Sequence, residues 1–270
     1  MKRTIIIALL ISVTGVFALH LLRRSAEPIP RLSQPPHPSD PTLLAAGAAA
    51  PAPEHGPMRS SPGSRTTAPA SAAPASVPAG WSDLSALTVQ QSLDKLCNPQ
   101  TPFQQKQELW KQLRDSGKLD QAIAELEQRT RDNPANADAP ANLGQAYLQK
   151  AGSIQDIREQ GILGMKADQV FDTALNADPT NWDARFWKAT AMSYWPAVLG
   201  KSKEVMQHCV TLIEQQENLP LQPHYLQSYV LLGEQYQKAG YANDAKDIWQ
   251  RGQRYFPNDP SLKEKLASLQ

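Results

Sequence analysis

From residue 81 onward, apolar residues recur at helical spacing, and the same arrangement returns along the chain. Two stretches align directly: LWKQLRDSGKLDQAIAELEQRTRDNP at 109–134 and LGEQYQKAGYANDAKDIWQRGQRYFPNDP at 232–260. A third copy is interrupted by extra residues, with its front half at 143–147 and its back half at 167–179. A helical pattern that returns at a fixed period is typical of stacked helix hairpins. The sequence therefore predicts an all-α repeat domain over residues 81–270.

Each repeat combines three kinds of residue in the same order. A small residue lets two helices approach, a large apolar residue fills the space between them, and a proline ends the second helix because it lacks a backbone N–H. In the last repeat these are Gly233, Trp249 and Pro257. The predicted repeat core consists of Leu109, Ala122, Leu126, Leu143, Gly144, Tyr147, Ala167, Phe171, Ala174, Leu232, Gly233, Tyr236, Ala245 and Trp249.

This pattern resembles the tetratricopeptide repeat (TPR) family, whose 34-residue helix-turn-helix units stack into a right-handed α-solenoid. The resemblance covers about residues 100–260. It implies four repeats, of 34, 45, 44 and 34 residues, at 103–136, 137–181, 182–225 and 226–259. The periodicity also predicts a leading helix at 84–97, and a capping helix at 260–270 that covers the last apolar surface.

The two middle repeats are longer than the family's unit. In the second repeat the extra residues are expected at the turn between its helices, near 150–166. In the third, most are expected at the equivalent turn, in YWPAVLGK at 194–201. Insertions at one point of stacked repeats emerge on one edge of a solenoid, which is often a binding edge.

The resemblance further implies a concave groove lined by the first helix of each repeat. Gln107 and Ala141 stand where the chaperone-tail-binding TPRs have a carboxylate clamp, so that mode of binding is not predicted. The groove is instead rich in glutamine, with aromatic side chains in the third repeat, and suits a neutral, partly apolar peptide or helix. The residues predicted to contact a partner are Phe186, Tyr194, Trp195, Gln145, Thr190 and Glu234. Whether the groove or the inserted edge binds is left open.

The N-terminus carries an addressing signal. An apolar run at residues 4–22 follows Lys2 and Arg3 and ends before Arg23 and Arg24. At helical rise this run matches the hydrocarbon thickness of about 30 Å. Residues 1–24 are therefore predicted to be a transmembrane anchor, with a signal peptide cleaved after Ala18 as the alternative. Two basic residues flank the run on each side, and the free amino terminus favours an inside N-terminus. This predicts an inner-membrane protein with its C-terminal domain in the periplasm, or a periplasmic protein if the segment is cleaved.

Residues 25–80 are rich in proline, alanine and serine and predict a disordered linker. Charge is also uneven along the chain. Residues 1–80 contain seven basic and three acidic residues, whereas residues 81–270 contain 20 and 23, for a net charge of +1 overall. Neither part has the clustered basic residues that phosphate neutralisation requires, so nucleic-acid binding is not predicted.

Catalytic and metal-binding patterns are not recognised in the sequence. The five histidines are dispersed, and His208 and Cys209 are adjacent, so on a helix they point about 100° apart. GILG at 161–164 lacks the Lys-Ser/Thr that follows a phosphate loop. We predict no enzyme activity, no cofactor and no metal. Cys97 and Cys209 are interpreted as separate buried thiols, with a disulfide between them as the alternative.

Together these features predict a membrane-tethered, extracytoplasmic TPR scaffold that binds a protein partner of unknown identity. A role in envelope complex assembly or biogenesis follows, such as that of the anchored TPR proteins of cytochrome c maturation. The alternative is a structural spacer of the envelope that self-associates into homo-oligomers and binds no peptide.

Overall fold

The computed structural model describes residues 28–33 and 84–269. Residues 28–32 and those from 84 onward belong to one compact unit. Within 84–269 the regular structure is entirely helical, which confirms the predicted all-α class. The α-helices are α2 (Val89–Leu96), α3 (Phe103–Asp115), α4 (Leu119–Asp132), α5 (Asp138–Ser153), α6 (Ile157–Ala177), α7 (Trp182–Ser193), α8 (Ser202–Gln216), α9 (Leu226–Lys238), α10 (Ala242–Tyr255) and α11 (Pro260–Ala267). Three short 3-10 helices are η1 (Leu84–Ala86), η2 (Ala197–Leu199) and η3 (Pro223–Tyr225).

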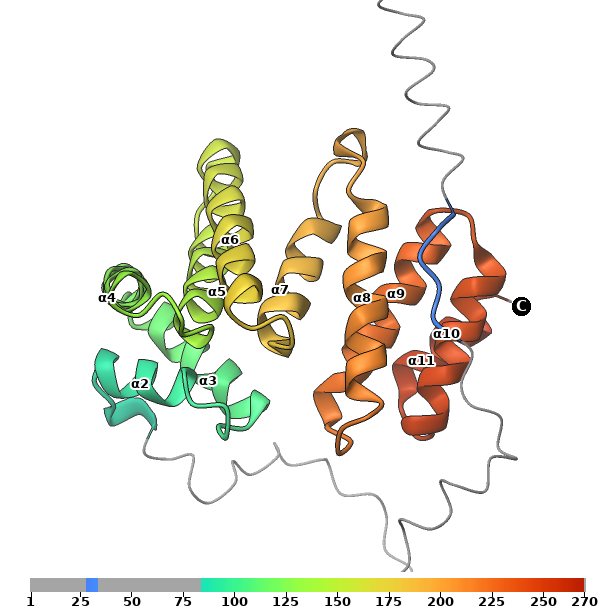
Figure 1. The fold of residues 1–270 in the computed structure, drawn as a ribbon, viewed down its shortest axis with the longest axis horizontal. Coiled ribbons are helices and arrows are strands. Elements are labelled where there is room, and N and C mark those ends of the chain that lie inside the picture. Colours follow the sequence, from blue (N-terminus) through green and yellow to red (C-terminus); the bar gives the residue numbers. More distant parts are fainter. Residues whose placement is uncertain (1–27, 34–83, 270) are drawn as a thin grey trace, which may run out of the picture. The chain divides into compact units, whose positions relative to one another are not determined.

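The helices form four consecutive hairpins, α3–α4, α5–α6, α7–α8 and α9–α10 (Figure 1). Successive hairpins pack on one another, α4 on α5, α6 on α7 and α8 on α9, as in an α-solenoid. The short helix α2 packs on α3 and α4 ahead of the first hairpin. At the far end α11 packs on α10, with the Asp259 side chain accepting a hydrogen bond from the Leu262 amide at its N-cap.

Close contact between the two helices of a hairpin depends on the glycine of each signature. A Cβ added at Gly144 would lie 2.4 Å from the Phe171 ring, and one at Gly233 would lie 2.1 Å from the Trp249 ring. Such distances are far inside van der Waals contact, so α5–α6 and α9–α10 tolerate only glycine at these points. All of the residues assigned to the repeat core from the sequence are buried.

The expansion of the second repeat differs from the expected turn. Its extra residues lengthen both helices: α5 continues to Ser153, α6 begins at Ile157, and only residues 154–156 connect them. The Asp156 carboxylate caps α6 by accepting hydrogen bonds from the amides of Arg158 and Glu159, at 2.8 and 3.3 Å. This cap satisfies amides that a helix start otherwise leaves unpaired, which explains why the insertion is helical. In the third repeat the expansion is a loop containing η2, as expected.

No helix in the described part of the chain is long and apolar enough to cross a membrane. The predicted anchor at residues 4–22 lies outside the described residues, as does most of the predicted linker. The membrane anchor therefore stays a prediction.

Candidate functional site

The concave side of the third hairpin is filled by aromatic rings rather than open. The Trp182 and Phe186 rings stack with their centroids 4.7 Å apart, and Trp187 meets Phe186 edge-on at 5.2 Å. Phe103, from the start of α3, stacks on His224 of η3 at 4.6 Å and meets Trp182 edge-on at 6.1 Å. Side chains of the first and third repeats thus form one cluster, which we call the aromatic closure (Phe103, Trp182, Phe186, Trp187 and His224).

An ion pair reinforces this closure. Lys106 Nζ lies 2.7 Å from Asp183 Oδ2, and both side chains are largely buried. The pair joins α3 to α7 across the concave side, and a charge-assisted hydrogen bond of this kind is shorter and stronger than a neutral one. Burial of the His224 ring lowers its pKa, so the ring in the closure is held in its neutral form.

What remains of the predicted groove is a polar cleft between α3 and η3–α9. It has a volume of about 460 Å³, and Gln104, Gln107, Lys111 and Gln227 are among the residues that line it. A neighbouring cleft of about 490 Å³ reaches the rings of the closure and the carboxylates of Asp138 and Asp183. The predicted glutamine-rich surface is therefore brought together beside the half-buried rings of Phe103 and His224, whereas Phe186 is buried.

Two of the predicted contact residues are not on the surface. Phe186 is 4% exposed and Gln145 is 3% exposed, so the expectation that they face an open groove is corrected. The physical reason for Phe186 is that the rings of Trp182 and Trp187 cover it, and both of these rings contact Phe103 of α3. Glu234 accepts a hydrogen bond of 2.6 Å from Lys265 of α11, and Thr190 is half-buried on α7.

Tyr194, in contrast, is among the most exposed large hydrophobic residues of the domain. It is the C-cap residue of α7 and its side chain is 84% exposed. Trp195, the next residue, is half-buried against the C-terminal core, with Lys201 Nζ 5.8 Å from its ring centroid. The prediction that Trp195 begins the inserted edge agrees with this position, where the α7–α8 loop leaves the helix.

Exposed apolar side chains gather at the two expansions. From α6 these are Ile157, Ile162 and Met165, and from the α7–α8 loop they are Tyr194, Val198 and Leu199. Ile157 and Val198 are the most exposed aliphatic residues among them, at 81% and 87%. We call these six residues the hairpin edge. At 100° per residue the three α6 side chains fall within an arc of about 140°, on one side of the helix.

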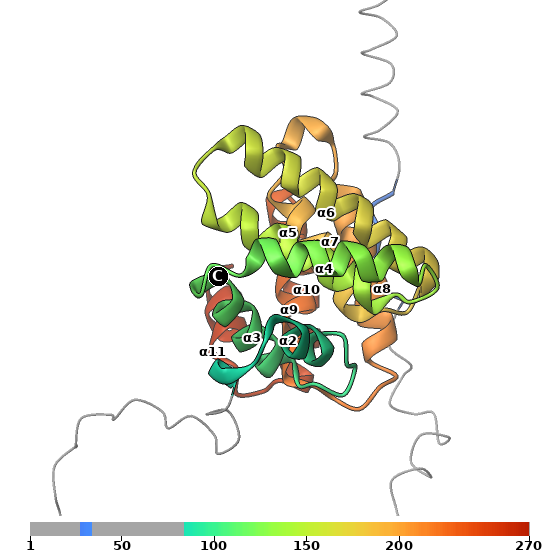
Figure 2. The ribbon, with the colours of Figure 1, turned by 90° about the vertical axis from the view of Figure 1, so that its left-hand side faces the viewer.

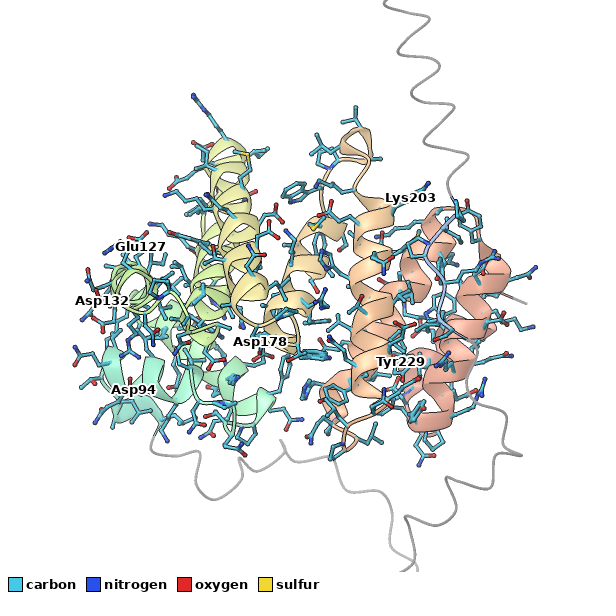
Figure 3. The ribbon with its side chains drawn as sticks, in the orientation of Figure 1. Asp94, Glu127, Asp132, Asp178, Lys203 and Tyr229 are labelled. Carbon is cyan, nitrogen blue, oxygen red and sulfur yellow. The ribbon has the colours of Figure 1, made fainter. Side chains whose placement is uncertain are left out.

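Both views of the ribbon show the two expansions on the same side of the domain. The tip of the α5–α6 hairpin and the α7–α8 loop both project toward the top of Figures 1 and 2, and in Figure 1 they stand apart. Figure 3 shows side chains extending from both tips away from the body of the domain. Large exposed apolar side chains clustered on one side of a monomeric domain make that side a candidate interaction surface.

Charged groups below the hairpin edge are paired with one another. Lys188 of α7 is bound by Asp168 and Asp172 of α6, the latter at 3.1 Å. Lys201 contacts Glu204 at 2.6 Å, and this hydrogen bond raises the Lys201 pKa, with smaller contributions from Asp168 and Asp172. The Lys188 pairs join α6 to α7, and the Lys201–Glu204 pair holds the end of the α7–α8 loop at the start of α8.

The thiols and histidines of the domain do not form a reactive centre. Burial raises the pKa of Cys97 to about 11 and also raises that of Cys209, so both remain protonated and poorly nucleophilic. Both thiols are free, in agreement with the favoured interpretation of separate cysteines. Burial and the nearby Arg185 lower the His208 pKa to about 4. Within the described residues, no group of three or more His, Cys, Asp or Glu side chains is arranged to hold a metal ion.

Among the comparisons with known proteins, only the one with solved structures found similar chains. TTC0263, described as a thermophilic TPR protein of Thermus thermophilus, is 16% identical, with 67% of this chain and 86% of that chain covered and a TM-score of 0.48. A structure of MamA is also 16% identical, with 59% and 81% covered and a TM-score of 0.47. No protein-family model and no curated protein matches the sequence. The repeat assignment rests on the helix packing and glycine contacts of this chain itself.

Proposed function

We propose that this chain is a TPR-like scaffold that binds a partner protein through the hairpin edge. The observation that carries the proposal is the presence of six exposed apolar side chains at two expansions that project from the same side of the domain. Side chains of this kind contribute about 1.5–3 kcal/mol each when a partner buries them fully. The occupant that fits is an apolar surface on another protein, such as one face of an amphipathic helix.

The concave side is a weaker candidate because its aromatic residues are already used. Phe186 stacks within the aromatic closure, and Lys106 is paired with Asp183. A peptide in the remaining cleft would meet glutamine side chains beside the Phe103 and His224 rings, and hydrogen bonds to the glutamines exchange with those of water at little net gain. The edge instead offers exposed apolar surface, and removing that surface from water on binding is favourable.

We further propose that the apolar run at residues 4–22 tethers the scaffold to a membrane with the helical domain outside the cytoplasm. The support is the length of the run and its flanking basic residues. A finer version is a role in envelope complex assembly, of the kind performed by anchored TPR proteins in cytochrome c maturation. That version is supported by the order of anchor, linker and repeats.

The proposed surface is tested by measuring how much partner protein co-purifies with the full-length chain and its variants. The variant Ile157→Asp/Val198→Asp places two charges where the partner would bury aliphatic groups, and we expect captured partner to fall at least tenfold. The matched control is Gln104→Asp/Gln227→Asp, which adds the same charge to the concave cleft and should change capture less than twofold. Loss of capture in the control with retention in the edge variant would contradict the proposal.

Self-association through the same edge is the competing function, and light scattering of the full-length chain in detergent separates the two. The binding function predicts one chain per particle. A dimer that dissociates in the Ile157→Asp/Val198→Asp variant would favour the self-associating spacer instead.

A further inference from the structure

A short piece of the predicted linker lies on the last repeat. Residues 28–33, PIPRLS, have no regular secondary structure. Ile29 and Leu32 are half-buried and pack against the C-terminal core, while Pro28 and Arg31 are exposed. In Figure 1 the segment is blue and runs between α8 and α10. The prediction that this part of the linker is disordered is therefore wrong.

Polar contacts hold the segment at two points. The Tyr236 hydroxyl of α9 donates a hydrogen bond to the Pro30 carbonyl. The Arg31 guanidinium meets both carboxylate oxygens of Asp244 on α10, with Nε 2.8 Å from Oδ1 and Nη2 3.2 Å from Oδ2. A guanidinium that engages a carboxylate through two nitrogens fixes orientation as well as charge.

The residues that receive the segment suit a peptide ligand. Burial raises the Tyr236 pKa to about 12, so its hydroxyl keeps the proton that it donates to the Pro30 carbonyl. The Asp244 carboxylate is mostly covered but reachable, with 22% of its side chain exposed. The proline rings fix φ at residues 28 and 30, so the segment loses little conformational freedom when it binds.

We propose that the α9–α10 surface is a binding site for an extended peptide of the type aliphatic–proline–arginine–aliphatic, and that residues 29–32 of the same chain are its resident ligand. The aliphatic side chains enter the C-terminal core, the peptide carbonyl meets Tyr236, and the arginine meets Asp244. Any other peptide of this chemistry binds by displacing the resident segment. This site is separate from the hairpin edge and does not depend on the function proposed for that edge.

A fluorescein-labelled peptide spanning residues 26–35 tests the site on the full-length chain in detergent. In wild type the resident segment competes, whereas Ile29→Asp/Leu32→Asp in the chain releases the segment and leaves the site open. We expect the released chain to bind the peptide at least tenfold more tightly than wild type, as measured by fluorescence anisotropy. Equal binding to the two chains would overturn the proposal.

Charge reversal tests the arginine contact in the released chain. Asp244→Lys should weaken peptide binding at least tenfold, whereas Asp247→Lys, one turn further along α10 and exposed, should change it less than twofold. A peptide carrying Arg31→Glu should recover binding to the Asp244→Lys chain, which a misfolded variant would not do. Equal effects of the two lysine substitutions, or failure of the charge-reversed peptide, would overturn the site.

Light scattering of the full-length chain in detergent tests whether the bound segment comes from the same chain or from a second copy. Binding within one chain predicts a monomer for wild type and for the Ile29→Asp/Leu32→Asp chain alike. A wild-type dimer that becomes monomeric in this variant would show that the segment comes from a second copy, and would overturn the assignment to the same chain.

Discussion

The aromatic closure and the hairpin edge both include residues of α7 and the loop that follows it, yet these residues have opposite properties. In the closure, Phe186 is buried against the rings of Trp182 and Trp187. At the edge, Tyr194 and Val198 are almost fully exposed and no described aromatic ring stacks on Tyr194. The difference teaches that aromatic content alone does not identify a binding surface. What distinguishes the two regions is whether another repeat covers the side chains.

Truncation should separate the two regions most strongly. Phe186→Ala removes a buried ring and leaves a cavity, so we expect it to lower the free energy of unfolding by about 3–5 kcal/mol. Tyr194→Ala is the matched control at the exposed end of the same helix and should change stability by less than about 0.5 kcal/mol. Urea unfolding followed by circular dichroism measures both. Comparable losses in the two variants would remove the distinction between closure and edge.

Alanine substitutions at two glycines should change stability by smaller amounts and in opposite directions. Gly144→Ala forces a Cβ against Phe171, and we expect a loss of about 1–3 kcal/mol. Gly161 lies in the extended part of α6, where a Cβ would meet nothing within 4 Å, so Gly161→Ala should stabilise the helix by about 0.5–1 kcal/mol. Thermal unfolding of the two variants measures the difference. Destabilisation by Gly161→Ala would mean that the tip of α6 is packed and not free.

Lowering the pH should reduce the free energy of unfolding through the closure, by less than the alanine substitution at Gly144. The folded-state pKa of His224 is lowered by burial, so the unfolded chain binds the proton more readily than the folded chain. The contribution of the neutral ring is present above the unfolded value of about 6.5 and is lost as the pH falls through the folded pKa. We expect stability to fall through His224 as the pH is lowered from 7.5 to 5.

Urea unfolding of wild type and His224→Gln at the two pH values measures this contribution. His208 acts with the same sign through its pKa of about 4, so His208→Gln serves as the comparison for an interior histidine outside the closure. If His224→Gln leaves the pH dependence of wild type unchanged, the closure does not hold a neutral His224.

The parts of the structure that sequence could predict are those set by a local period. The hairpins follow from residues whose spacing repeats, such as Gly144 with Phe171 and Gly233 with Trp249. The closure could not be predicted, because Phe103 and His224 lie in different repeats and no period relates them. The groove assignment of Phe186 assumed a regular repeat and failed for the same reason.

The position of the edge in the sequence was predicted, but the secondary structure of its α6 part was not. The extra residues of the second repeat were located correctly, but their helical periodicity and the Asp156 cap were not recognised, so a turn was expected instead of a longer α6. In the linker, the aliphatic pair Ile29 and Leu32 among prolines was the available signal for a docked segment. Composition averaged over residues 25–80 concealed it.

Docking of residues 29–32 also changes the expected reach of the linker. The proposed anchor ends at residue 22, so only a few residues connect it to the segment on α9–α10. The chain between residues 33 and 84 would then connect two points on the same helical domain and would not serve as a spacer from the membrane.

Site-specific photo-crosslinking tests the central claim most directly. The full-length chain would carry p-benzoylphenylalanine either at Val198 on the hairpin edge or at Gln104 in the concave cleft, in the cells that produce the protein. The account predicts light-dependent adducts to a partner protein from position 198 and a background level from position 104. Adducts from position 104 with none from position 198 would contradict it.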